Sequence, residues 1–190
     1  MAEMKSALER ALERAEQLGK LSPEEMQRKK EEEYIPVGEG LAKRYLEHGY
    51  RDLLAEGINK YNGEEKAIIT QAVLSTLVQS IELENSELTE RALQGILSLR
   101  MNERIENMRQ GVENILSGYH QTKQERHEVG RAAIERSVRE SLHRMRISGS
   151  AVGEVNAETG EAWRRIVGEL QSEFGARLSE LKKSLTEALD

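Results

Sequence analysis

The strongest candidate for chemistry in this sequence is the spacing Glu140-x-x-His143. Two-metal sites in helical bundles use a Glu and a His at this spacing, because it places both side chains on one face of a helix. Such a site also needs a second Glu-x-x-His pair and two further glutamates, and no glutamate stands three residues before His48, His120 or His127. We therefore interpret His143 as an ordinary surface or interface residue. A metal site or a helical-bundle enzyme that uses Glu140 and His143 stays as the alternative.

A second candidate is the arginine-rich stretch that contains His120 and His127. Its cations are Lys123, Arg126, Arg131, Arg136, Arg139, Arg144 and Arg146. Such a stretch could bind an acidic protein, a nucleic acid or an anionic lipid. Glutamates alternate with the cations, however, and Glu135 stands four residues before Arg139, where the two side chains pair on a helix surface. We interpret the stretch as a solvated helix face.

Glycines at 38 and 40 precede Lys43 and Arg44, an arrangement that invites comparison with a phosphate-binding loop. The segment lacks a preceding strand and the Gly-Lys-Ser/Thr ending that such loops have. We interpret it as a turn after Pro36. The chain has no cysteine, which excludes a thiolate nucleophile, and no Ser/His/Asp arrangement is legible. The sequence therefore predicts no catalytic, cofactor-binding or metal-binding residue.

Composition indicates an all-α protein. A third of the 190 residues are charged and 4% are aromatic, which is typical of solvent-facing helices that share narrow apolar stripes. The net charge of −6, with both signs interleaved, argues against a nucleic-acid partner and fits a soluble cytoplasmic protein. The most apolar run, residues 67–83, is shorter than the roughly 20 apolar residues that cross a bilayer, so no membrane span is predicted.

Residues 1–33 are predicted to form an amphipathic and then highly charged helical extension. Residues 1–18 show a heptad seam made of Met4, Leu8, Ala11, Ala15 and Leu18. Ser22 and Pro23, followed by Glu25, form a strong helix start with a capping box. This second helix is expected to end before Ile35-Pro36, because the residue before a proline is pushed out of the helical region.

Residues 34–85 are predicted to form the buried helical core. A helix is expected from Val37 to Tyr61, with a break at Gly49 as the alternative. Asn62 can cap the next helix, from Glu64 to Leu83, which is apolar nearly all round. A helix that is apolar on every side is buried on every side. This helix is therefore expected to be the centre of the fold.

Residues 86–147 are predicted to form one long, coiled-coil-like helix. Its apolar stripe runs through Met101, Ile105, Met108, Val112, Ile115, Tyr119, Thr122, Arg126, Val129 and Ala133, and then slips to Ile134, Val138, Leu142 and Met145. A turn at Ser117-Gly118 would fold this stretch into a hairpin, but the register continues across it, and we prefer one helix. The heptad register also predicts a homodimer that forms through residues 101–133.

Residues 148–160 are rich in glycine and small residues and are predicted to form a loop. Residues 161–190 follow as a C-terminal helix that packs back on the long one, with Trp163 and Phe174 anchoring the contact. The expected architecture is a single all-α domain, an elongated helical bundle. The expected function is that of a non-enzymatic interaction, scaffold or adaptor protein without cofactors, which forms a homo-oligomer and acts through helix surfaces.

Overall fold

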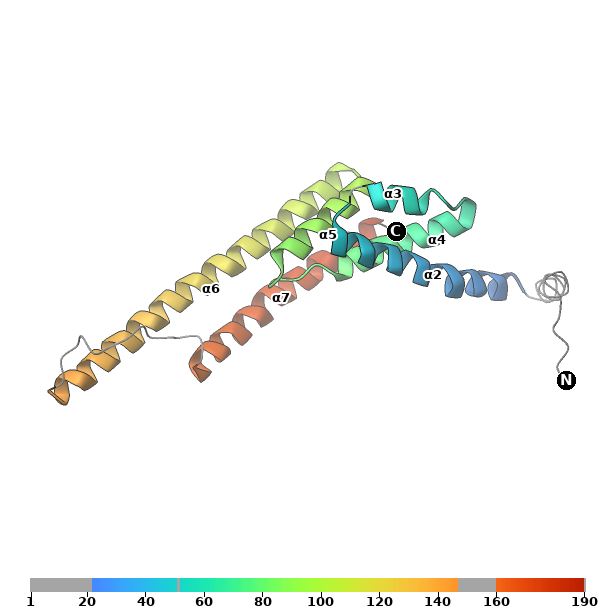
Figure 1. Cartoon of the computed structure of the whole chain (residues 1–190). Helices are drawn as coiled ribbons and strands as arrows, with labels where there is room; N and C mark the ends of the chain where they lie inside the picture. Colours follow the sequence, from blue (N-terminus) through green and yellow to red (C-terminus); the bar gives the residue numbers. More distant parts are fainter. Residues whose placement is uncertain (1–21, 51, 147–159, 190) are drawn as a thin grey trace, which may run out of the picture. The chain divides into compact units, whose positions relative to one another are not determined.

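The computed structural model describes residues 22–50, 52–146 and 160–189, and these contain six helices and no strand. The helices are α2 (Pro23–His48), α3 (Asp52–Ile58), α4 (Gly63–Gln79), α5 (Ser86–Leu99), α6 (Glu103–Arg144) and α7 (Glu161–Leu189) (Figure 1). The all-α fold is therefore confirmed. The seam predicted for residues 1–18 and nearly all of the predicted loop lie outside the described residues.

The chain forms two compact units, Met1–Leu77 and Val78–Asp190, which divide within the last turn of α4. Each unit is described by itself below. The single domain expected from the sequence stays a prediction.

In the first unit, α2 begins with the capping box that the sequence predicts. The Ser22 hydroxyl oxygen accepts a hydrogen bond from the Glu25 amide at 3.2 Å, and the Glu25 carboxylate accepts one from the Ser22 amide at 2.8 Å. Pro23 occupies the first turn, where its missing N–H is not needed. The start of this helix is therefore determined by local sequence.

Two expectations are wrong: Pro36 does not break the helix, which runs on as α2 to His48, and the helix expected from Val37 to Tyr61 is interrupted at Gly49, as the alternative had it. A proline inside a helix removes one backbone hydrogen bond, so contacts elsewhere must offset its cost. Such contacts exist on both sides, where the Tyr34 hydroxyl donates to Glu65 at 2.9 Å and Gly38 lies against α4. The helix ends instead at Gly49, which adopts a left-handed conformation with φ 70°.

The contact between α2 and α4 depends on Gly38. A Cβ atom there would lie 2.6 Å from the Cβ of Ala72 and 2.7 Å from the carbonyl oxygen of Ile69. The inner side chains of α4 are fully buried, namely Ile69, Val73, Leu74 and Leu77. These side chains are buried as expected, whereas the position of this helix at the centre of the whole fold stays a prediction.

In the second unit, the helix expected over residues 86–147 is interrupted, and this part of the prediction is wrong. Backbone dihedrals leave the helical region at Arg100, and α6 starts two residues later behind Asn102. The Asn102 side chain accepts the amide hydrogen of Ile105 at 2.8 Å, which is standard N-capping. From Glu103 onward α6 is continuous through Ser117-Gly118, as preferred over a hairpin.

α7 packs along α6 in the antiparallel direction (Figure 1). Successive contacts show this direction, because residue numbers fall along α6 as they rise along α7. A Cβ at Gly118 would lie 3.3 Å from Phe174, and one at Gly111 would lie 3.0 Å from Leu181. The edge of the Phe174 ring meets the Tyr119 ring with centroids 5.8 Å apart. The expectation that the C-terminal helix folds back on the long one is confirmed.

This pairing occupies part of the seam that the sequence assigns to a dimer interface. Ile105, Val112 and Tyr119 are at most 2% exposed within a single chain. On α7, which packs along α6, the side chains of Leu170, Phe174, Leu178 and Leu185 are buried as well, and Phe174 contacts Tyr119. These seam residues are therefore not available to a second copy while α7 is in place.

Candidate functional site

The structure places Glu140 and His143 in the last turns of α6, where both side chains are exposed. In the described part of the chain, no group of three or more His, Asp or Glu side chains could hold a metal ion. The structure therefore does not bring further ligands to this pair. His120 lies elsewhere, with its Nε2 2.9 Å from the Ser86 hydroxyl oxygen.

The most connected polar site of the second unit is one that the sequence does not reveal, the Glu84 cluster. It consists of Glu84, Tyr119, Lys123 and Gln171. Glu84 stands in the loop between α4 and α5, whereas Tyr119 and Lys123 come from α6 and Gln171 from α7. Three segments that are distant in sequence therefore meet at one carboxylate.

All of the contacts in the Glu84 cluster converge on the Glu84 carboxylate. The Lys123 ammonium lies 2.8 and 3.0 Å from its two oxygens, and Gln171 donates to it at 3.1 Å. The Tyr119 hydroxyl donates a third hydrogen bond. The ammonium also lies 5.4 Å from the centroid of the Tyr119 ring. The carboxylate thus fastens the α4–α5 loop to both long helices.

The electrostatics of the cluster keep the carboxylate ionised. Burial by itself raises the pKa of Glu84, but hydrogen bonds from Lys123, Tyr119 and Gln171 outweigh it and lower the pKa to about 2. Burial, reinforced by the hydrogen bond to Glu84, raises the pKa of Tyr119. A carboxylate with so low a pKa is a poor proton acceptor near neutral pH. We therefore interpret the Glu84 carboxylate as a group that stabilises the fold rather than as a general base.

Two further groups hold the same loop. The Lys182 ammonium donates to the carbonyl oxygens of Gln79 and Ile81 at 2.9 and 3.0 Å, which satisfies carbonyls at and just after the end of α4. Burial lowers the pKa of Lys182. The buried Thr89 hydroxyl donates to the Glu82 carbonyl at 2.9 Å and accepts from the Glu82 amide at 2.8 Å. The α4–α5 loop is thus fixed by side chains from α5, α6 and α7.

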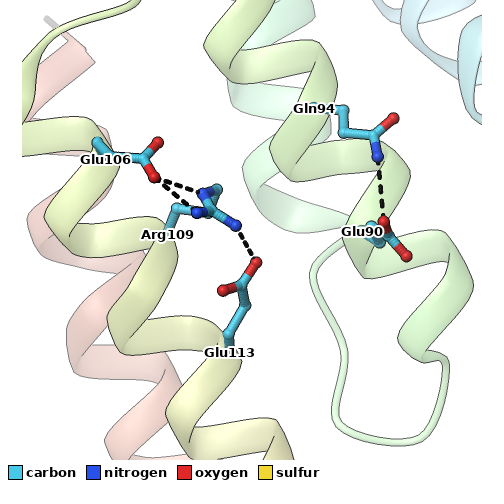
Figure 2. A network of polar contacts seen from close by, with 5 residues as sticks. All are labelled: Glu90, Gln94, Glu106, Arg109 and Glu113. Carbon is cyan, nitrogen blue, oxygen red and sulfur yellow. Dashed lines mark hydrogen bonds and ion pairs between the residues drawn. The ribbon is translucent and has the colours of Figure 1, made fainter.

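The exposed flank of the second unit near the start of α6 carries charges that pair along their own helices. Figure 2 shows Arg109 between Glu106 and Glu113 on α6, with Glu90 and Gln94 on α5 nearby. The Arg109 guanidinium donates to Glu106 at 2.6 and 3.0 Å. Further along α6, Glu135 lies 3.7 Å from both Arg131 and Arg139. These pairs are consistent with a solvated face and leave only part of the positive charge unpaired.

Within the residues that the structure describes, a partly exposed apolar stripe lies at the end of α6, residues 131–144, which we call the α6 extension. The contact between the rings of His127 and Trp163 lies close to the start of α7. Beyond it α6 continues past the first turn of α7 (Figure 1). Ile134, Val138 and Leu142 recur every four residues there, so they share one helix face. Ile134 is 40% exposed, and the other two are half-buried.

A family model described as "Family of unknown function (DUF6657)" matches residues 55–187, which is more than half of the chain. The chain belongs to this family. Neither a curated protein nor a solved structure gives a match. None of the helices in the described ranges is both long enough and apolar enough to cross a membrane.

Proposed function

We propose that this member of a family of unknown function is a non-enzymatic interaction protein that associates with a second copy of itself through the α6 extension. The observation that carries the proposal is the apolar stripe of Ile134, Val138 and Leu142 on a helix that outruns its intramolecular partner. Upstream of the contact between His127 and Trp163, the apolar residues Val112 and Tyr119 of α6 are buried on the side where α7 packs, whereas Val129, just beyond that contact, is 70% exposed. A second copy would supply an equivalent helix to the part that α7 does not reach.

The α6 extension carries four arginines, Arg131, Arg136, Arg139 and Arg144, against two glutamates, Glu135 and Glu140. An antiparallel second copy would bring Arg131 of one copy beside Glu140 of the other, which offsets part of the repulsion between the two positively charged segments. Specific interfaces bury about 1,200–2,000 Å² in total, and one pair of helix segments of this length lies near or below the lower end. We therefore expect a dimer that dissociates on dilution. The chain's mixed charge, with net −6, is compatible with a cytoplasmic role, which forms part of the proposal.

The test is sedimentation velocity over a range of protein concentrations, with the parent chain and two variants. Val138→Asp places a charge in the stripe and should shift the protein to monomer at all concentrations. Ala132→Asp adds the same charge at an exposed position outside the stripe, because residues 132 and 138 are about 120° apart around the helix at 100° per residue. This control should dimerise like the parent. A parent chain that stays monomeric throughout, or equal loss in both variants, would contradict the proposal.

A further inference from the structure

In the first unit, a pocket of about 300 Å³ opens between α2, α3 and the turn that follows α3. We call it the α2–α3 pocket. The residues that matter for its chemistry are Val37, Gly40, Leu41, Arg44, Lys60 and Tyr61. We infer that the α2–α3 pocket binds a small organic carboxylate whose body is apolar. This site is independent of the α6 extension.

The pocket has a packed floor. A Cβ atom at Gly57 would lie 2.6 Å from Leu41 Cδ1, so the glycine allows α3 to lie directly on the Leu41 side chain. At the other end, the Tyr61 amide donates to the Ile58 carbonyl at 3.1 Å, and the edge of its ring meets the Tyr34 ring with centroids 5.9 Å apart. The walls are therefore positioned by contacts that exist without a ligand.

The two cations that line the pocket favour an anionic ligand. Arg44 and Lys60 both line it and both are exposed, and neither forms an ion pair within the ranges that the structure describes. The neighbouring Lys43 differs, because its ammonium lies 3.7 Å from the carboxylate of Glu39. A guanidinium matches the two oxygens of a carboxylate, and an ammonium adds a second charge-assisted contact. The pocket thus presents an anion site beside an apolar wall.

The apolar wall and the size restrict the class of ligand. Val37 is 37% exposed and lies in the wall with Leu41. At Gly40, an added Cβ would have no heavy atom within 4 Å, so the helix surface there is open. Ligand pockets usually measure about 300–1,000 Å³, which puts this one at the small end. Inorganic phosphate would leave the apolar wall uncovered and an alcohol would leave the cations unpaired, whereas a short aliphatic carboxylate satisfies both.

Isothermal titration calorimetry of the full chain with octanoate tests the inference, with 1-octanol and inorganic phosphate as comparison probes. We expect saturable one-to-one binding of octanoate that is at least tenfold tighter than binding of either comparison probe. Arg44→Met, which keeps an unbranched side chain, should weaken octanoate binding at least tenfold. The matched control Lys43→Met removes the adjacent, already paired cation and should change it less than twofold.

A second variant fills the pocket without removing a charge. Gly40→Leu places a side chain in the open space and should abolish octanoate binding, while the thermal melting temperature stays at or above that of the parent. If Gly40→Leu fails to fold, the inference is tested by comparing the octanoate affinities of Arg44→Met and Lys43→Met. Equal binding of 1-octanol and octanoate, unchanged binding in Arg44→Met, or no saturable binding would each overturn the inference.

Discussion

The hydroxyl of Tyr119 donates a hydrogen bond to the carboxylate of Glu84, a residue 35 positions earlier in the chain. The Tyr119 side chain is fully buried, so its hydroxyl needs an acceptor within the protein. Glu84 supplies that acceptor from the α4–α5 loop. A single contact therefore couples the position of this loop to the middle of α6.

Removing the Tyr119 hydroxyl should destabilise the protein with little change in packing. Tyr119→Phe keeps the ring and its contact with Phe174, but it removes one hydrogen bond to a charged group. Such bonds contribute about 1.5–3 kcal/mol, and Lys123 and Gln171 still hold the carboxylate, so we expect a loss of about 1–2 kcal/mol in the free energy of unfolding. Urea denaturation measures it. The control Tyr50→Phe, at a side chain 68% exposed, should change nothing; an equal loss there would contradict the argument.

Glu84 should make stability depend on pH in the acid range. Its folded pKa of about 2 lies below the ordinary 4.5, so its contribution is fully present above about pH 4.5 and is lost as pH falls towards 2. The side chain is 44% exposed, and solvent screening reduces the expected contribution to about 1 kcal/mol. The stability difference between the parent and Glu84→Gln should therefore shrink between pH 5 and pH 2.5 in urea titrations. A pH-independent difference for Glu84→Gln would contradict the prediction.

The starts of α2 and α5 were predictable because their signals are local. Ser22 and Glu25 lie three residues apart and cap each other, and Asn85 caps α5 by accepting the Leu88 amide hydrogen at 3.1 Å. The course of α2 through Pro36 was not predictable in this way, because the contacts that offset the missing hydrogen bond come from α4. The local rule for proline was outweighed by tertiary packing.

The Glu84 cluster was not predictable from the sequence for a related reason. The other members lie 35 to 87 positions from Glu84, and no spacing rule joins them to it. One signal was present: Tyr119 occupies a core position of the apolar stripe, and a buried tyrosine hydroxyl needs a polar partner. The identity of that partner depends on how α7 and the α4–α5 loop meet α6. The sequence could therefore indicate that a partner exists without naming Glu84.

The buried centre of the first unit should be α4. Val73 is fully buried, so a charge placed there would have no partner. Unpaired buried charges cost about 3–5 kcal/mol of stability. Val73→Asp should therefore unfold the protein or lower its free energy of unfolding by a similar amount. Ala67→Asp introduces the same residue at an exposed position of α4 and should change stability by less than about 0.5 kcal/mol. Thermal melts followed by circular dichroism compare the two. Similar melting temperatures for Val73→Asp and the parent would show that α4 is not the centre.

Two glycines of α2 should respond in opposite directions to the same substitution. At Gly38 an alanine Cβ would lie 2.7 Å from the Ile69 backbone oxygen, so α2 must move away from α4, and overpacking of this kind costs about 1–3 kcal/mol. At Gly40 the added Cβ meets open space, so Gly40→Ala should gain up to about 1 kcal/mol from the higher helix propensity of alanine. Urea denaturation of both variants and the parent shows whether each substitution raises or lowers the free energy of unfolding. The two positions lie on the same helix, two residues apart. Loss of stability in both variants would mean that α2 tolerates no Cβ here for reasons other than its contact with α4. A gain of stability in both variants would show that α2 does not pack on α4 at Gly38.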